Sequence, residues 1–158
     1  MSAENLIIFD SKELCIAFRK SGNVILYSDS GLYLKSDYKY RIEPWIENEK
    51  LKSTHNVIEI NRNVRFSAFE NSLETILIQK EPIDSNFLSA ENIVILNLQK
   101  PGNQIIELLI HSKPRLVILP KSISYFRKKE IIGQLNEHAI PFHDIATDGF
   151  LEFDLSYP

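Results

Sequence analysis

The sequence predicts an α/β fold with a mixed β-sheet, formed by an antiparallel N-terminal meander and a parallel βαβαβ unit near the C-terminus. Short apolar or alternating runs separated by turn residues occupy residues 6–27, as in consecutive hairpins. Two continuous apolar runs, Ile93–Leu96 and Leu116–Leu119, are typical of strands buried on both faces. Segments with helical spacing of apolar residues follow both runs, as parallel crossovers require.

The N-terminal meander is expected to contain three strands. They cover Leu6–Phe9, Leu14–Phe18 and Val24–Tyr27. Residues 10–12 and 20–23 separate them and are rich in Asp, Ser, Gly and Asn, which favour tight turns. Short connections of this kind join antiparallel neighbours.

The middle of the chain combines a helix signal with further strands. Pro44 is suited to the first turn of a short helix, with Trp45 and Leu51 as core contacts. A hairpin turn is expected at residues 70–72. The strand-like runs of this region are Val57–Ile60, Val64–Phe69 and Leu73–Ile78.

The last third alternates strands and helices. One helix is expected to begin near Gly102, and Ser122 or Ser124 is expected to cap a second. A strand over Phe142–Ile145, which Pro141 starts, and a final strand over Phe150–Leu155 complete the chain, which is expected to end in a strand pair. The apolar residues at roughly helical spacing in the second helix are Tyr125, Phe126, Ile131, Ile132 and Leu135.

Composition predicts a single soluble domain over residues 1–158. The chain is 44% hydrophobic and 25% charged, as in packed globular proteins. No apolar run approaches the roughly 20 residues that cross a bilayer, and no signal-peptide pattern is present. Because the chain enters a strand almost at once, we expect a domain excised from a longer protein.

Positive charge is concentrated in one segment. Residues 113–129 carry +6 with no acid, whereas the net charge of the whole chain is -3. This segment is either a solvated basic edge or a patch that binds a polyanion. The candidate nucleic-acid-binding residues are Lys121, Arg127, Lys128 and Lys129. The last three lie at the start of a predicted helix, where cations oppose the helix dipole, so a purely solvent-exposed role does not explain them.

A second candidate surface interleaves aromatic and cationic residues between positions 33 and 41. Such a pattern either stacks and holds single-stranded nucleic acid or buries the rings while the charges face water. Its members are Tyr33, Lys35, Tyr38, Lys39, Tyr40 and Arg41.

The sequence indicates neither a catalytic nor a metal site. The four histidines are dispersed, and Pro141 separates His138 from His143, so these two cannot share a regular helix face. Cys15 lies in an apolar run that favours a buried small hydrophobe over a nucleophile. Phosphate-binding, dinucleotide and nucleophile-elbow motifs are absent. We therefore expect no cofactor and no small-molecule substrate. Asp29, at the end of a strand, is the one acid that merits attention.

Several short motifs carry a family resemblance. Lys113–Leu119, Ile140–His143 and Asp148–Phe153 are similar to the end of the metallo-β-lactamase-like domain of ComEC proteins. In that domain a Lys-Pro-x-x-apolar strand precedes a helix, an Ile-Pro-apolar strand and an Asp-Gly-x-apolar strand. Gly22–Asp29 resembles the family's strand leading to a Thr-Gly-Asp turn. The resemblance places Asp29 on the acid that bridges metals in active relatives.

Departures from the family pattern decide the chemistry that the resemblance implies. Ser28 replaces the turn glycine, and Gln99–Gly102 stands where active relatives have a histidine pair. The upstream His-x-His-x-Asp-His block is absent, and a single carboxylate does not hold a catalytic metal. The chain looks most like the reduced version in ComEC-like proteins of the Bacteroides group, with a metallo-β-lactamase-like half fold.

The resemblance implies a non-catalytic, soluble, extracytoplasmic (periplasmic) domain excised from a larger polytopic membrane protein, a channel that admits single-stranded DNA during transformation. Its expected partners are the channel portion of the same protein and single-stranded DNA, bound weakly and without sequence preference. Two alternatives remain open. One is a metal-dependent hydrolase completed by residues outside this chain, and the other is a purely structural protein-interaction domain.

Overall fold

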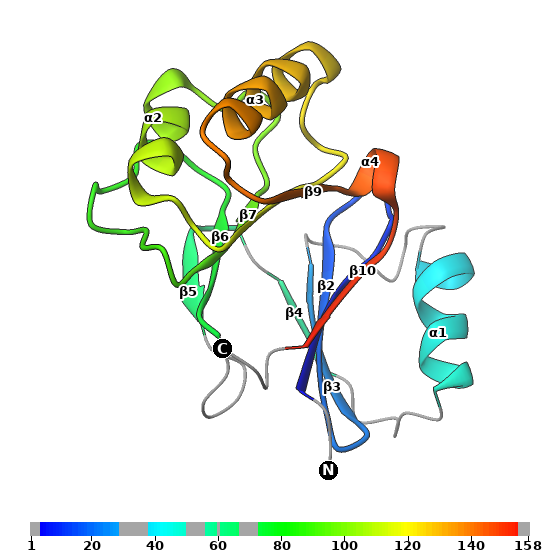
Figure 1. Ribbon diagram of the computed structural model, residues 1–158. Coiled ribbons are helices and arrows are strands. Elements are labelled where there is room, and N and C mark those ends of the chain that lie inside the picture. The colour runs from blue at the N-terminus through cyan, green and yellow to red at the C-terminus, as the bar shows by residue number, and fades with distance from the viewer. Residues whose placement is uncertain (1–3, 29–37, 50–55, 60, 67–72, 155–158) are drawn as a thin grey trace. The chain divides into compact units, whose positions relative to one another are not determined.

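The computed structural model describes residues 4–28, 38–49, 56–59, 61–66 and 73–154. The chain divides into two compact units. Unit 1 comprises residues 1–61, 68–72 and 145–158, and unit 2 comprises residues 62–67 and 73–144. Within the described residues, each unit is built on a five-stranded sheet (Figure 1).

The sheet of unit 1 has the strand order β10-β1-β2-β3-β4. Its pairs are antiparallel except for β3 and β4, which are parallel. The helical segments described in this unit are the π-helix η2 (Tyr38–Ile42), which leads into α1 (Glu43–Asn48), and the short α4 (Ile145–Asp148). The strands are β1 (Glu4–Ile8), β2 (Cys15–Lys20), β3 (Asn23–Ser28), β4 (Asn56–Glu59) and β10 (Leu151–Asp154).

A two-residue turn fixes the register of β2 and β3. Ser21 and Gly22 both have positive φ, 52° and 79°, as a type I′ turn requires. Lys20 therefore pairs with Asn23, and the two strands stay in register up to Cys15 and Ser28. The predicted turn in this segment is confirmed.

One face of the unit 1 sheet packs against η2 and α1. Pro44 lies in the first turn of α1, where its missing N–H and fixed φ are compatible with a helix, as predicted. Trp45 packs edge to face on Phe9, with the ring centroids 5.2 Å apart. Leu51 lies outside the described residues. The buried cluster is Ile7, Phe9, Cys15, Ala17, Val24, Leu26, Tyr38, Ile42 and Ile46.

The sheet of unit 2 has the strand order β5-β6-β7-β8-β9. β5 and β6 are antiparallel, and the remaining pairs are parallel. The predicted neighbours β7 and β8 are paired, with Ile93 opposite Leu116 and Ile95 opposite Ile118. The elements are β5 (Val64–Phe66), β6 (Thr75–Ile78), β7 (Ile93–Leu96), α2 (Asn103–Ser112), β8 (Leu116–Leu119), α3 (Tyr125–Glu137) and β9 (Phe142–Asp144).

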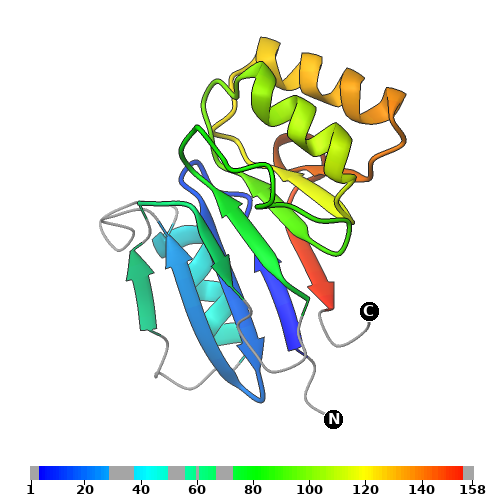
Figure 2. The same ribbon diagram turned by 90° about the vertical axis from the view of Figure 1, so that its left-hand side faces the viewer.

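Both crossover helices of unit 2 cover the same face of its sheet (Figures 1 and 2). Alternate side chains of the central strands point toward the helices and form one apolar cluster with them. From the strands this cluster includes Val94, Leu96, Val117 and Leu119, and from the helices Ile105, Leu109, Ile131 and Leu135. The residues between them in the strands, such as Ile95 and Ile118, are also fully buried. Both central strands are therefore buried on both faces, as their apolar runs predict.

The predicted α/β class, with an antiparallel part and a parallel part, is confirmed, but the strands are divided between two sheets. The last strand, β10, pairs with β1 of the N-terminal meander, where Ile8 lies opposite Leu151. Sequence periodicity shows which side of a strand is apolar but not which strand becomes its neighbour. A single domain over residues 1–158 stays a prediction. No helix within the described segments is both long and apolar enough to span a bilayer.

Some predicted boundaries differ from the structure. The strand that follows Pro141 ends at Asp144, and Ile145 begins α4 instead of extending the strand. The hairpin turn expected at residues 70–72 and the end of the strand over Val64–Phe69 lie outside the described residues. The antiparallel pairing of β5 with β6 agrees with a hairpin between them.

Truncation of Leu109 tests the packing of α2 on the sheet. Leu109 is fully buried in the unit 2 cluster. Leu109→Ala removes apolar contacts and leaves a cavity, so it should lower the free energy of unfolding by about 2–5 kcal/mol. Urea titration followed by circular dichroism measures this loss. Glu107→Ala, at an exposed position of the same helix, should change the unfolding free energy by less than about 0.5 kcal/mol. Equal effects of the two substitutions would contradict this packing.

Candidate functional site

The carboxyl ends of four parallel strands meet at one edge of the unit 2 sheet. β6, β7, β8 and β9 are parallel neighbours, so the residues that follow them lie along the same side. In open α/β sheets, ligands bind at this side. We define the carboxyl edge as residues 79–81, 97–102, 120–124 and 144. It is the place in unit 2 where a functional site is expected.

Neutral side chains link three of these strand ends. The Asn97 side-chain amide donates to Gln79 Oε1 at 3.0 Å. The Ser122 hydroxyl donates to Asn97 Oδ1 at 2.7 Å. This chain of hydrogen bonds joins the ends of β6 and β7 to the segment after β8. These polar groups are therefore engaged in holding the edge together.

The loop after β7 is anchored by a carboxylate. The Gly102 N–H donates to Glu81 Oε1 and Oε2 at 3.1 and 3.0 Å. A Cβ atom at position 102 would lie 2.8 Å from Glu81 Oε1, so glycine permits this close approach. Gly102 is the N-cap of α2, and the Glu81 charge stabilises the positive end of that helix. Glu81 therefore has a structural role.

Arg127 secures the same loop from α3. Its Nε donates to the Pro101 carbonyl oxygen at 2.5 Å, and its Nη2 donates to Asn103 Oδ1 at 2.9 Å. Its Nη1 forms an ion pair with Glu130 Oε2 at 2.5 Å. The guanidinium thus lies against residues Gln99–Gly102, the segment that, by the family resemblance, replaces the histidine pair of active relatives.

A buried ion pair connects α3 to β9. Lys128 Nζ lies 2.8 Å from Asp144 Oδ1, and the two side chains are only 9% and 7% exposed. Lys128 shares a helix face with the buried Ile131 and Leu135, at spacings of three and seven residues. That periodicity is the sequence signal for its burial. Nothing in the sequence pattern singles out Asp144 as its partner, because the contact spans the turn from α3 into β9.

The four candidate phosphate-binding cations do not share one exposed surface. Lys121 and Lys129 are exposed, Arg127 is partly buried and bonded, and Lys128 is buried and paired. The expectation of four accessible cations is therefore corrected for Lys128, whose ammonium lies inside unit 2. Its charge compensates Asp144, which explains a cation near the start of α3 without any external anion.

The interleaved aromatic and cationic segment is also divided. Tyr38 is buried in the unit 1 cluster, whereas Tyr40 is 72% exposed. Lys39 Nζ lies 5.8 Å from the centroid of the Tyr40 ring, a cation–π distance. The core interpretation therefore holds for Tyr38 and not for Tyr40. Tyr33 and Lys35 lie outside the described residues.

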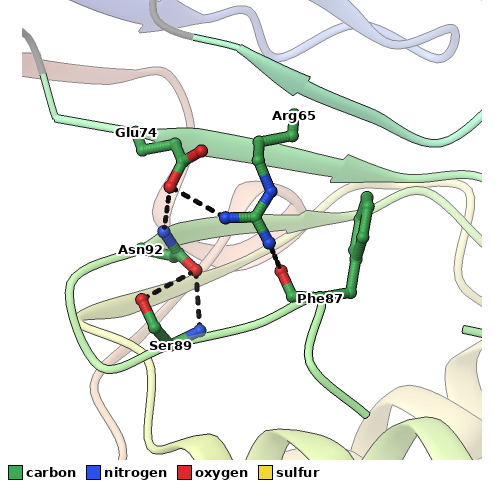
Figure 3. Close-up of polar contacts among 5 residues, drawn as sticks. All are labelled: Arg65, Glu74, Phe87, Ser89 and Asn92. Atoms are coloured by element: carbon green, nitrogen blue, oxygen red, sulfur yellow. Dashed lines mark hydrogen bonds and ion pairs between the residues drawn. The ribbon is translucent and has the colours of Figure 1, made fainter. Parts of the chain in front are cut away.

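The amino end of the unit 2 sheet carries its own polar network (Figure 3). Glu74 Oε2 accepts from Arg65 Nη1 at 2.9 Å and from the Asn92 amide at 3.1 Å. Asn92 Oδ1 accepts from the Ser89 N–H at 2.7 Å, and Arg65 Nη2 donates to the Phe87 carbonyl oxygen. The network ties β5 and β6 to the loop before β7. The network therefore stabilises the amino end of the sheet, opposite the carboxyl edge.

The described residues bear on two kinds of chemistry, that of the Cys15 thiol and that of a bound metal ion. Cys15 is fully buried, as predicted, and burial raises the pKa of its thiol, so the thiol stays protonated at neutral pH. Among the described residues, no three or more His, Cys, Asp or Glu side chains converge as a metal ion requires. Asp29 lies outside these residues. His138 Nδ1 is within 2.9 Å of the Gln134 carbonyl oxygen, a contact inside its own helix end.

The fold and this edge define a small α/β protein whose usual ligand-binding side is closed by internal hydrogen bonds and an ion pair. The family model of the ComEC C-terminal domain matches residues 6–155, and the chain belongs to this family. It is therefore part of a competence protein of DNA uptake, which is membrane-associated. Comparisons with curated proteins and with solved structures found no match. The metallo-β-lactamase-like half fold and the Bacteroides-group origin stay predictions.

The buried ion pair makes a stability prediction. Lys128→Met leaves the Asp144 carboxylate buried without its partner, which should lower the free energy of unfolding by about 3–5 kcal/mol. Lys128→Met combined with Asp144→Leu removes both charges and should recover most of the loss. Urea titration of wild type, Lys128→Met, Asp144→Leu and the double variant measures the coupling. Lys129→Met, at the exposed neighbouring position, is the matched control and should be nearly neutral. A double variant as unstable as Lys128→Met would contradict the pair.

Proposed function

We propose that the chain is a non-catalytic domain of a DNA-uptake channel protein, which lies on the extracytoplasmic side and contacts incoming single-stranded DNA weakly. The observation that carries the non-catalytic assignment is the internal closure of the carboxyl edge. Asn97 is bonded to Gln79 and Ser122, and Arg127 is bonded to Pro101 and Asn103. Family membership supports the channel context.

The charges at this edge disfavour a metal ion. Zinc and manganese sites need several neutral imidazoles or anionic oxygens that converge on one point. Here the Arg127 guanidinium lies against the loop after β7, and the Lys128 ammonium is paired with the carboxylate that ends β9. Both cations would repel a divalent ion. The acids of the edge, Glu81 and Asp144, are each engaged by a structural donor.

The DNA contact is assigned to the exposed cations of the basic segment. Lys121 and Lys129 remain at the surface of unit 2. Two lysines that neutralise phosphates give weak binding without sequence preference, because phosphates carry no base information. The channel portion of the same protein would bring DNA to this surface at high local concentration, so weak affinity is sufficient. The channel portion is therefore the proposed partner.

The purified chain should not cleave DNA. Incubation of single- and double-stranded DNA with the protein and added Mn²⁺ or Zn²⁺ should leave both substrates intact on a denaturing gel. Protein purified without added ions should hold less than about 0.1 metal per chain by mass spectrometry, because a lone carboxylate binds such ions weakly. Cleavage that disappears in Asp29→Ala would favour the hydrolase alternative instead.

Binding of single-stranded DNA should depend on salt and on the exposed lysines. A fluorescein-labelled oligonucleotide should bind at low salt, and its affinity should fall roughly tenfold on raising the salt from about 20 to about 150 mM, since counterions are released on binding. Lys121→Glu with Lys129→Glu should abolish detectable binding. The control is Lys12→Glu with Arg62→Glu, which changes the net charge equally at exposed sites outside both candidate surfaces and the carboxyl edge. Equal loss of DNA binding in both double variants would show that the contact depends on net charge alone and not on Lys121 and Lys129.

A further inference from the structure

Helix α3 begins with two aromatic side chains at the surface. Tyr125 is 73% exposed and Phe126 is 84% exposed. Their ring centroids are 5.5 Å apart, with an interplanar angle of 77°. Helical spacing in the sequence suggests that both belong to the apolar face of α3. Phe126 lies five residues before the buried Ile131, however, and at 3.6 residues per turn this directs it away from the sheet. Tyr125 lies three residues before the buried Lys128, and its ring is exposed at the first residue of the helix.

Three exposed lysines flank these rings in sequence or across the loop contacts. Lys121 precedes them and Lys129 follows them by one helical turn, both at the surface. A third, Lys100, comes from the loop after β7 and is also exposed. The Ser124 N–H donates to the Gln99 carbonyl oxygen at 2.9 Å, and Arg127 Nε donates to that of Pro101. Residues on both sides of Lys100 are thus bonded to residues on both sides of the aromatic pair. We define the aromatic-basic patch as Lys100, Lys121, Tyr125, Phe126 and Lys129.

The patch has positive charge with little acid nearby in sequence. Residues 113–129 contain no Asp or Glu, and the first turn of α3 is free of acids. The next acid along the helix, Glu130, forms an ion pair with Arg127. At the corresponding end of α2, in contrast, Glu81 occupies the positive helix end. The aromatic rings are therefore presented in a cationic environment that complements a polyanion.

The patch stands on a rigid support. Ile131 and Leu135 anchor α3 in the unit 2 cluster, and the Lys128–Asp144 pair fixes the rotation of the helix next to the rings. Arg127 holds the loop that carries Lys100. A surface whose supports are already ordered loses less conformational entropy on binding.

We propose that the aromatic-basic patch binds single-stranded DNA by stacking bases on Tyr125 and Phe126 while the three lysines contact the phosphates. This inference rests on the proposed function and deepens it, because stacking adds affinity that charge alone does not supply. Unpaired bases have free π-faces, whereas duplex bases are already stacked, so single strands are favoured over duplex. Stacking tolerates any base, which suits DNA of arbitrary sequence.

An anionic membrane surface is the competing occupant, and the helix disfavours it. Interfacial helices bury a broad apolar face among the lipid headgroups. Beyond the two rings, exposed positions of α3 include Lys129, Glu130, Asn136 and Glu137, which are polar or charged. Two rings edge to face, with lysines around them, match the size of one or two nucleobases better than a lipid interface.

Fluorescence anisotropy with a labelled oligothymidine of about 15 nucleotides, within the usual site size, tests the proposal. At low salt, Tyr125→Ala with Phe126→Ala should weaken binding at least tenfold relative to the full wild-type chain. Tyr125→Phe with Phe126→Tyr keeps both rings and should bind within about twofold of wild type. Ile58→Ala removes an exposed apolar side chain of unit 1 outside both candidate surfaces, and it should have no effect.

Two further measurements separate stacking from charge. An abasic oligonucleotide of equal length keeps the phosphates, so wild type should bind it only as weakly as the double alanine variant binds oligothymidine. In Phe126→Trp, the added indole emission should be quenched by the oligothymidine and not by the abasic strand. Wild type, whose single tryptophan is Trp45, provides the blank.

Each outcome decides between the proposals. Failure of wild type to bind the oligothymidine at low salt overturns both the DNA contact and the stacking site. Binding by wild type that the double alanine variant retains overturns the stacking site alone. If vesicles of phosphatidylglycerol and phosphatidylcholine bind the patch and the oligothymidine does not, a membrane surface replaces DNA as the occupant. Unchanged circular dichroism of the variants confirms that they are folded.

Discussion

The parallel pairing of β7 with β8 is the constraint on which unit 2 depends. Parallel neighbours cannot be joined by a tight turn, so α2 must cross back between them, and α3 does the same between β8 and β9. Both helices cover one face (Figure 2). The same pairing gathers the carboxyl ends of four strands along a single edge. The loop that carries Lys100 and the start of α3 therefore lie where α/β sheets usually place ligands.

The carboxyl edge shows how a ligand-binding position can be used for structure. In a catalytic α/β protein, polar side chains at this edge contact the ligand. Here Asn97 is hydrogen-bonded to Gln79 and Ser122, and Arg127 holds the loop after β7. The Lys128–Asp144 pair adds little net stability over an apolar pair but penalises any arrangement that separates its members. It therefore specifies how α3 is rotated against the sheet. The rotation that buries Lys128 also directs Phe126, two residues earlier, to the solvent side, while Tyr125 is exposed at the first residue of the helix.

Helix geometry, and not composition, decides which cations of the basic segment are buried and which are exposed. The sequence places six cations between residues 113 and 129, and three of them, Arg127, Lys128 and Lys129, lie in α3. Lys128 shares a face with Ile131 and Leu135, so it is internal, whereas Lys129 is one residue further round and external. Lys100 is 21 residues before Lys121 in sequence, and the loop contacts to Ser124 and Arg127 bring its segment to α3. Sequence alone offers no signal for that approach, because the contact is long-range.

By itself the sequence determined the elements and the family. Short-range periodicity and turn chemistry depend on neighbouring residues, so the meander, the two central strands and both long helices were predictable, as was the burial of Cys15. The ComEC resemblance rests on motifs that are likewise local. Only the tertiary structure decided that β10 pairs with β1, that Asp144 forms an ion pair with Lys128, and that the rings of Tyr125 and Phe126 are exposed to solvent. Strand partners, buried charges and exposed rings depend on contacts between segments far apart in sequence, and local patterns do not encode them.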